Sequence, residues 1–184
     1  MAKQAPVLPQ HKIQELRVLV ALQGILRSQF IYPTNPASRF DGKLQRFSPP
    51  NGEGDLFCLV ENKDRRKQSI EAQLREGTVF VDTDKVDALV PLSKKWQGWF
   101  DETRVYLTQT NGDTALAIRL STNGVRVDRA RGLEWRQVKR WVPAFTGGKT
   151  VFKRLYAIPL EYVEFEFDLP DLSLPSAPLV GPGK

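Results

Sequence analysis

Reactive side chains are scarce in this sequence, because its 184 residues include one cysteine and one histidine. A lone Cys58 cannot form an intramolecular disulfide, which favours a reducing, cytoplasmic compartment. Cys58 lies in the apolar run 56–60, where we expect a small buried side chain rather than a reactive thiol. One cysteine and one histidine cannot supply most of a tetrahedral shell, so no zinc or other metal site is predicted.

Catalysis by a histidine base is also not expected, because His11 lies in an N-terminal arm, residues 1–12, that contains two prolines. Three aspartates lie close together in residues 82–87, and we expect Asp84 to cap a helix rather than bind a cation. Hydrolysis by paired carboxylates remains an open alternative, since acids are plentiful and no pair stands out. We therefore predict a non-enzymatic protein without a cofactor.

Residues 146–150 read Thr-Gly-Gly-Lys-Thr, like the end of a phosphate-binding P-loop. The full motif needs a glycine at the position that Pro143 occupies, and proline has no backbone N–H to donate. We expect a glycine hairpin turn that presents Lys149.

Long apolar runs are absent too. No stretch approaches the roughly 20 apolar residues of a membrane-spanning helix, and no apolar segment of signal-peptide type follows the N-terminus. The sequence thus predicts a soluble protein that does not contact a membrane.

The sequence is rich in positive charge, with a formal net charge of +6 that is distributed unevenly. Residues 101–156 carry a net +6, whereas residues 157–184 carry a net −4. A basic body with an acidic end favours binding to a polyanion, with a C-terminal strip that could recruit a protein partner.

The densest basic stretch, residues 126–154, has nine Lys or Arg against two acids, with Trp135, Trp141, Phe145 and Phe152 among them. Cations that neutralise phosphates, next to rings that stack on bases, are typical of a sequence-tolerant nucleic-acid surface. We nevertheless expect Trp135 and Trp141 to lie in the core. Trp96 and Trp99 remain open between a core position and a base-stacking platform.

Apolar periodicity predicts mostly strands. Residues 16–26 fit both periods and remain open between helix and strand, and Gly24 with the β-branched residues favours a long strand that bends at the glycine and continues to residue 32. Residues 64–76 are the best helix, ended by Gly77, and a short helix after Asp82 should stop at Pro91. Residues 133–142 remain open between helix and strand.

Two Asn-Gly pairs, at 111–112 and 123–124, separate alternating apolar runs. They predict a three-stranded antiparallel meander with hairpin turns at both pairs. Within the first run, Val105 and Leu107 should share one face.

These elements together predict a mainly β fold, a small antiparallel barrel or sandwich with one short helix, at 64–76, and an extended C-terminal tail. We expect a single domain at 13–168 and a disordered proline-rich tail at 169–184. The order of a bent first strand, two strands near Lys43 and at 56–60, a helix and a strand at 78–81 is similar to that of an oligonucleotide-binding (OB) barrel. The outline resembles single-stranded DNA-binding proteins with an acidic tail, although this chain ends in Val-Gly-Pro-Gly-Lys.

We therefore expect a protein that binds single-stranded DNA or RNA, with cations along the backbone and rings stacked on bases. One alternative is a β-rich interaction or accessory subunit that docks an acidic partner, and a weaker one is a barrel around a small molecule. The oligomeric state is left open. The candidate binding residues are Arg39, Phe40, Lys43, Arg46, Phe47, Lys94, Lys95, Trp96, Trp99, Arg126, Arg136, Lys139, Arg140, Lys149, Lys153 and Arg154.

Overall fold

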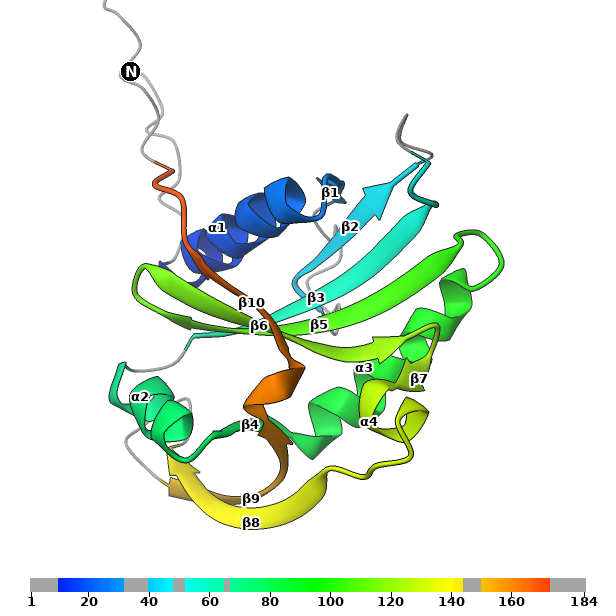
Figure 1. Cartoon of the computed structure of the whole chain (residues 1–184). Helices are drawn as coiled ribbons and strands as arrows, with labels where there is room; N and C mark the ends of the chain where they lie inside the picture. The colour runs from blue at the N-terminus through cyan, green and yellow to red at the C-terminus, as the bar shows by residue number, and fades with distance from the viewer. Residues whose placement is uncertain (1–9, 32–39, 48–51, 65–66, 144–149, 173–184) are drawn as a thin grey trace, which may run out of the picture.

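The structure, a computed structural model, describes residues 10–31, 40–47, 52–64, 67–143 and 150–172. Its strands form two sheets, one with the order β1-β2-β3-β5-β6-β10 and with β7 beside β6, the other with the order β4-β9-β8 (Figure 1). The strands are β1 (Gln29–Ile31), β2 (Gly42–Arg46), β3 (Leu56–Asp64), β4 (Thr78–Asp82), β5 (Glu102–Asn111), β6 (Thr114–Thr122), β7 (Val125–Arg126), β8 (Arg136–Pro143), β9 (Thr150–Pro159) and β10 (Val163–Asp168). The helices are α1 (Gln10–Ile25), α2 (Lys67–Arg75), α3 (Thr83–Ser93) and α4 (Val127–Ala130), with short 3-10 turns at Lys94–Trp96 and Leu160–Tyr162.

The mainly β prediction is confirmed, but its details are corrected. The described strands close no barrel, and β3 pairs with β5 in parallel, so the large sheet is mixed. A parallel pair needs a long crossover, and here α2, β4 and α3 supply it. The prediction of one short helix is wrong, since the described residues form four α-helices.

The first segment differs most from expectation, because helix α1, residues 10–25, includes the end of the expected N-terminal arm and most of the segment for which a bent strand was favoured. Val18, Leu19 and Leu22 are fully buried at the spacing of one helical face, and they pack against Leu44 of β2. Sequence periodicity could not separate the two forms because apolar residues occupy both faces of the segment. Without a first strand here, the OB order is not reproduced.

The meander is confirmed, with β5, β6 and β7 joined by the two Asn-Gly turns. Asn123 and Gly124 both have positive φ, 48° and 70°, as a type I′ hairpin turn requires. Val105 and Leu107 share one face, as expected, while Tyr106 lies buried on the other. Both faces of the sheet are therefore covered.

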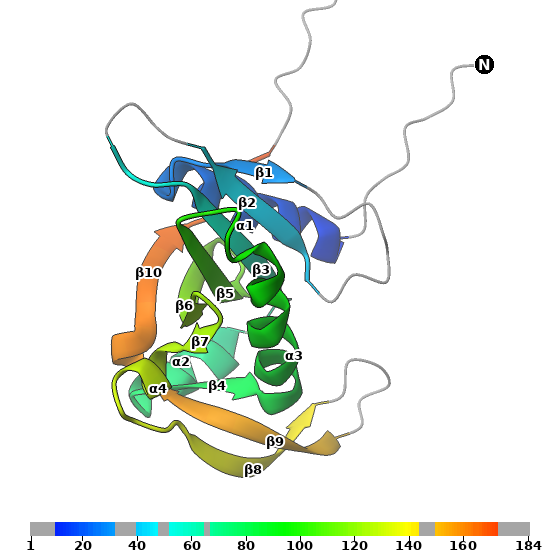
Figure 2. The same ribbon diagram turned by 90° about the vertical axis from the view of Figure 1, so that its right-hand side faces the viewer.

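Each face of the large sheet has its own core. The α1 face contains Cys58, which is fully buried as expected, and burial raises the pKa of its thiol to about 12. On the opposite face, α3 and the small sheet pack over the strands, and Val79, Val86 and Ile158 are fully buried there (Figure 2). The small sheet is thus anchored to the large one at one end of its strands.

Three helix boundaries also differ from expectation. Helix α2 begins at Lys67, because β3 continues to Asp64. Helix α3 continues past Pro91 to Ser93. Asp82 occupies the N-cap of α3 without a side-chain cap bond, so Asp84 is not the cap. Asp84 lies in the first turn, where the helix dipole stabilises a carboxylate.

The C-terminal end of the fold extends past residue 168. Leu169 is buried in the α1-side core, and its N–H donates to the Asp113 carbonyl at 2.6 Å. Arg17 of α1 donates to the carbonyls of Leu169 and Pro170. The expected boundary at 168 therefore divides a packed segment.

We expect a chain that ends at Leu172 to unfold like the full chain, because it keeps all of these contacts. A chain that ends at Asp168 should lose about 1.5–3 kcal/mol of unfolding free energy, the contribution of one buried leucine. Urea unfolding of both chains measures the difference. Equal stability would show that Leu169 contributes little to the core.

Candidate nucleic-acid interface

Most of the basic stretch forms a β-hairpin, because residues 136–142, left open between helix and strand, lie in β8. Strands β8 and β9 carry Arg136, Lys139, Arg140, Lys153 and Arg154 and contain no acid. Strand β4 pairs only with the second half of β9, as far as Leu155. The other half of the hairpin therefore extends beyond the three-stranded part of the sheet.

One face of this extension carries two rings and two cations, and we call it the aromatic face. Trp141 lies opposite Phe152, and Lys139 lies opposite Arg154, so all four side chains point the same way. Trp141 is 69% exposed and Phe152 is 55% exposed, with their ring centroids 5.2 Å apart. Lys139 and Arg154 have no ion-pair partner among the described residues.

The opposite face of the hairpin carries Arg136, Arg140 and Lys153, of which the last two are neutralised. Arg140 pairs with Glu76 at 3.0 Å and lies over the ring of Phe80. Lys153 pairs with Asp82, also at 3.0 Å. In the half of the hairpin beyond β4, the cations without an ion-pair partner therefore lie beside the exposed rings. Arg136, which has no ion-pair partner among the described residues either, lies on the opposite face and in the half that β4 covers.

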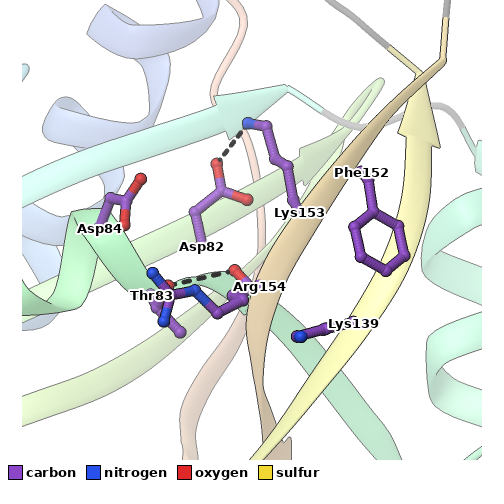
Figure 3. Close-up of a pocket in the computed structure, with 7 residues that line it drawn as sticks. All are labelled: Asp82, Thr83, Asp84, Lys139, Phe152, Lys153 and Arg154. Atoms are coloured by element: carbon purple, nitrogen blue, oxygen red, sulfur yellow. Dashed lines mark hydrogen bonds and ion pairs between the residues drawn. The ribbon is translucent and has the colours of Figure 1, made fainter.

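A pocket of about 420 Å³ opens between this hairpin and the first turn of α3 (Figure 3). Thr83 donates to the carbonyl of Arg154 at 3.2 Å, which ties the helix start to β9. The pocket lining contains acidic and basic side chains. Asp82 and Asp84 come from the β4–α3 corner, and the hairpin contributes Lys139, Phe152, Lys153 and Arg154.

Arg126, predicted as a binding residue, does not lie on the hairpin and is only 6% exposed. Its guanidinium lies against the rings of Trp135 and Tyr156 and donates to both carboxylate oxygens of Asp128. Burial alone would raise the pKa of Asp128, but the hydrogen bonds from Arg126 and from the Trp135 amide hold that pKa below its ordinary value. Trp135 is a core residue, as expected.

A second group of predicted residues lies along β2, beside the 3-10 turn that follows α3. Lys43 lies over the rings of Phe40 and Trp96, and Trp96 stacks on the buried Phe57. Trp96 is half-buried, whereas Trp99 is 80% exposed. Lys94, Lys95 and Phe47 are exposed here as well.

Arg46 belongs to the fold rather than to a binding surface. It pairs with Glu53 at 2.7 Å and donates to the carbonyls of Leu26 and Gly54. Those bonds hold together the chain around β2. Arg39 and Lys149 lie outside the described residues.

The structure thus brings five of the predicted residues, those of β8 and β9, onto one hairpin. Arg126 and Arg46 lie apart from the hairpin, and each has an internal ion-pair partner. Trp141 and Phe152 were named among the rings of the basic stretch but not among the candidate binding residues, and the core position expected for Trp141 is wrong. The sequence contains a pattern that indicates the exposed position of Trp141. Trp141 follows two cations, and a strand through 136–143 places it on the same side as Lys139.

Two interacting carboxylates, Glu61 and Asp41, lie near the end of β3. Glu61 is buried, and its pKa is raised by burial first and by Asp41 second. Lys85 and Lys63 pair with Glu61 at 2.5 and 3.4 Å, and Asp41 accepts the Asn62 backbone N–H. These partners tie the end of β3 to its neighbours, which is a structural role.

No helix among the residues described is long and apolar enough to cross a membrane. Comparison of the chain with protein-family models, curated protein sequences and solved structures finds no match.

Proposed function

We propose that the β8–β9 hairpin binds single-stranded nucleic acid on its aromatic face, without catalysis. The supporting observation is the exposed ring pair Trp141–Phe152 beside Lys139 and Arg154. Rings that are open to solvent can stack on unpaired bases, and every base has a stacking face. Cations without an internal partner are free to neutralise phosphates.

The charge asymmetry of the hairpin supports this choice of face. A phosphate that approached Arg140 or Lys153 would have to displace Glu76 or Asp82. At Lys139 and Arg154 it would displace no described carboxylate. The proposed surface is an extended hairpin, so it does not require the closed groove of an OB barrel.

The second candidate function is the docking of an acidic protein on the same surface. The exposed pair Trp141–Phe152 supports it, because aromatic residues are enriched at the centres of protein interfaces. An acidic peptide and an oligonucleotide differ in salt response. Counterions condensed on a single strand are released on binding, which gives a log–log slope of about −0.7 per neutralised phosphate.

The test compares two matched double variants in a fluorescence titration with oligo-dT and oligo-U at two salt concentrations. Lys139→Ala with Arg154→Ala should weaken binding and flatten the salt slope by roughly 1.4, the share of two phosphate contacts. Arg140→Ala with Lys153→Ala removes the same charge and should change the slope less. Equal effects of the two variants would show that the aromatic face is not preferred.

A further inference from the structure

A second cavity, of about 320 Å³, lies between α3 and the turn that joins β6 to β7. Pro91 of α3 lines one side, with Val86 and Val90 buried behind it, and Val125 lies on the other. Helix α3, strand β7 and helix α4 neighbour one another in both views (Figures 1 and 2). Val125 is 49% exposed, so part of the apolar lining is open to solvent. An open cavity with apolar walls and a few polar groups is typical of a small-molecule site.

The cavity also contains a preoriented buried arginine. Arg126 lines it while its guanidinium is fixed between two rings and held by Asp128. Of its five N–H groups, Nε and Nη2 each donate one to Asp128, and Nη1 donates one to the Tyr156 hydroxyl at 2.9 Å. The other two have no acceptor among the described residues. A buried guanidinium with free donors beside a cavity is suited to an anionic group.

Two further cations, Lys94 and Arg129, line the same cavity. Gly124 allows Lys94 to lie along the turn, since a Cβ at this position would meet the Lys94 side chain. Asp128 balances the charge of Arg126, and Glu134 lies 3.8 Å from Arg129 in an exposed pair that solvent screens. The attraction for an anion therefore comes first from Lys94 and second from Arg129. Asp87, which accepts from the Tyr156 hydroxyl at 3.3 Å, adds one acceptor for a hydroxyl or amino group.

We propose that this cavity binds a nucleotide unit through a phosphate monoester. Such a phosphate carries a charge of about −1.5 to −2 at pH 7 and three acceptor oxygens, which suits two cations and the donors of Arg126. The apolar walls would hold the base or sugar, and Asp87 would accept from one of their hydroxyl or amino groups. The site does not depend on the function of the hairpin.

The position of the cavity offers two sources for this phosphate. Phe152, Arg154 and Tyr156 are alternate residues of β9 and share one side of the strand, so they lead from the hairpin pocket to the hydroxyl beside Arg126. The phosphate could therefore belong to a free mononucleotide or to the phosphorylated end of a strand on the hairpin.

The first test titrates the full chain with adenosine monophosphate and with adenosine, by calorimetry. We expect the monophosphate to bind and adenosine to show no binding up to millimolar concentration. Lys94→Ala with Arg129→Ala should weaken binding of the monophosphate at least tenfold. Lys95→Ala removes a neighbouring lysine that does not line the cavity, and it should leave the affinity unchanged.

The second test compares oligo-dT with a phosphate or a hydroxyl at either end. A preference for the phosphorylated strand that disappears in the Lys94–Arg129 variant assigns the site to strand ends. Binding of the monophosphate without such a preference assigns it to free nucleotides. The inference is overturned if adenosine binds as well as its monophosphate, if neither binds, or if Lys95→Ala matches the double variant. The affinity for the unphosphorylated strand tests the hairpin separately.

Discussion

Replacing Asp128 with alanine is expected to lower the free energy of unfolding by about 3–5 kcal/mol, the cost of leaving a buried charge without its partner. Asp128 is completely buried, and it accepts from the Arg126 guanidinium and from the Trp135 amide at 2.7 Å. Its loss would leave both donors buried and the Arg126 charge uncompensated. Chemical denaturation of the variant and the parent chain measures the difference.

The exposed pair Arg129–Glu134, 3.8 Å apart, is the matched control in the same part of the chain. Glu134→Ala should change stability little, because solvent screens an exposed pair. A loss of similar size in both variants would contradict the structural role of the buried pair.

The same ion pair predicts the direction of an acid effect. Because the pKa of Asp128 is lowered in the folded chain, its carboxyl group binds fewer protons on average in the folded chain than in the unfolded chain at the same pH. Its stabilisation should be complete above its ordinary pKa and should be lost as the pH falls through the lowered value. In Asp128→Ala this part of the acid dependence should be absent.

Removing the ring pair is the second large expected effect. Trp141→Ala and Phe152→Ala should each cost about 1–3 kcal/mol of oligonucleotide binding, a roughly 5- to 150-fold loss of affinity for each ring that stacks on a base. Thermal stability should change little, because both side chains are largely exposed. Fluorescence anisotropy with labelled oligo-dT measures the affinities.

Trp99→Ala is the control for this experiment. Trp99 is more exposed than Trp141 but belongs to the second group of predicted residues, along β2 and the 3-10 turn. We expect its affinity to match that of the parent chain. If Trp99→Ala weakens binding and the hairpin variants do not, the interface lies at β2 and the 3-10 turn.

The turns and the helical segments show which parts of the fold can be predicted from sequence. Asn123 and Gly124 identified a hairpin because positive φ at both positions restricts which residues fit. Residues 16–26 were left open between helix and strand, with the strand favoured, because their apolar side chains satisfy both periodicities. Packing against β2 and β3 selects the helix, which ends at Ile25. The parallel pairing of β3 with β5 depends on a crossover through α2, β4 and α3, which no local pattern records.

The candidate site was predictable to a similar extent. Charge alone drew attention to residues 126–154, and five of those cations do lie on one hairpin. Charge could not show that Arg126 forms an ion pair with Asp128, or that Arg140 and Lys153 form ion pairs with Glu76 and Asp82. The pairings of Arg140 and Lys153 join residues that are 64 and 71 positions apart in the sequence, so they follow from the tertiary fold.

The most direct test of the proposed interface is a ¹H–¹⁵N titration of the labelled chain with unphosphorylated oligo-dT, which follows the indole N–H signals of its four tryptophans. The proposal predicts a large shift of the Trp141 indole signal, together with backbone amides of β8 and the first half of β9. The Trp99 indole signal should remain unchanged. Saturable binding that shifts Trp99 and leaves Trp141 in place, or the absence of any shift, would contradict it.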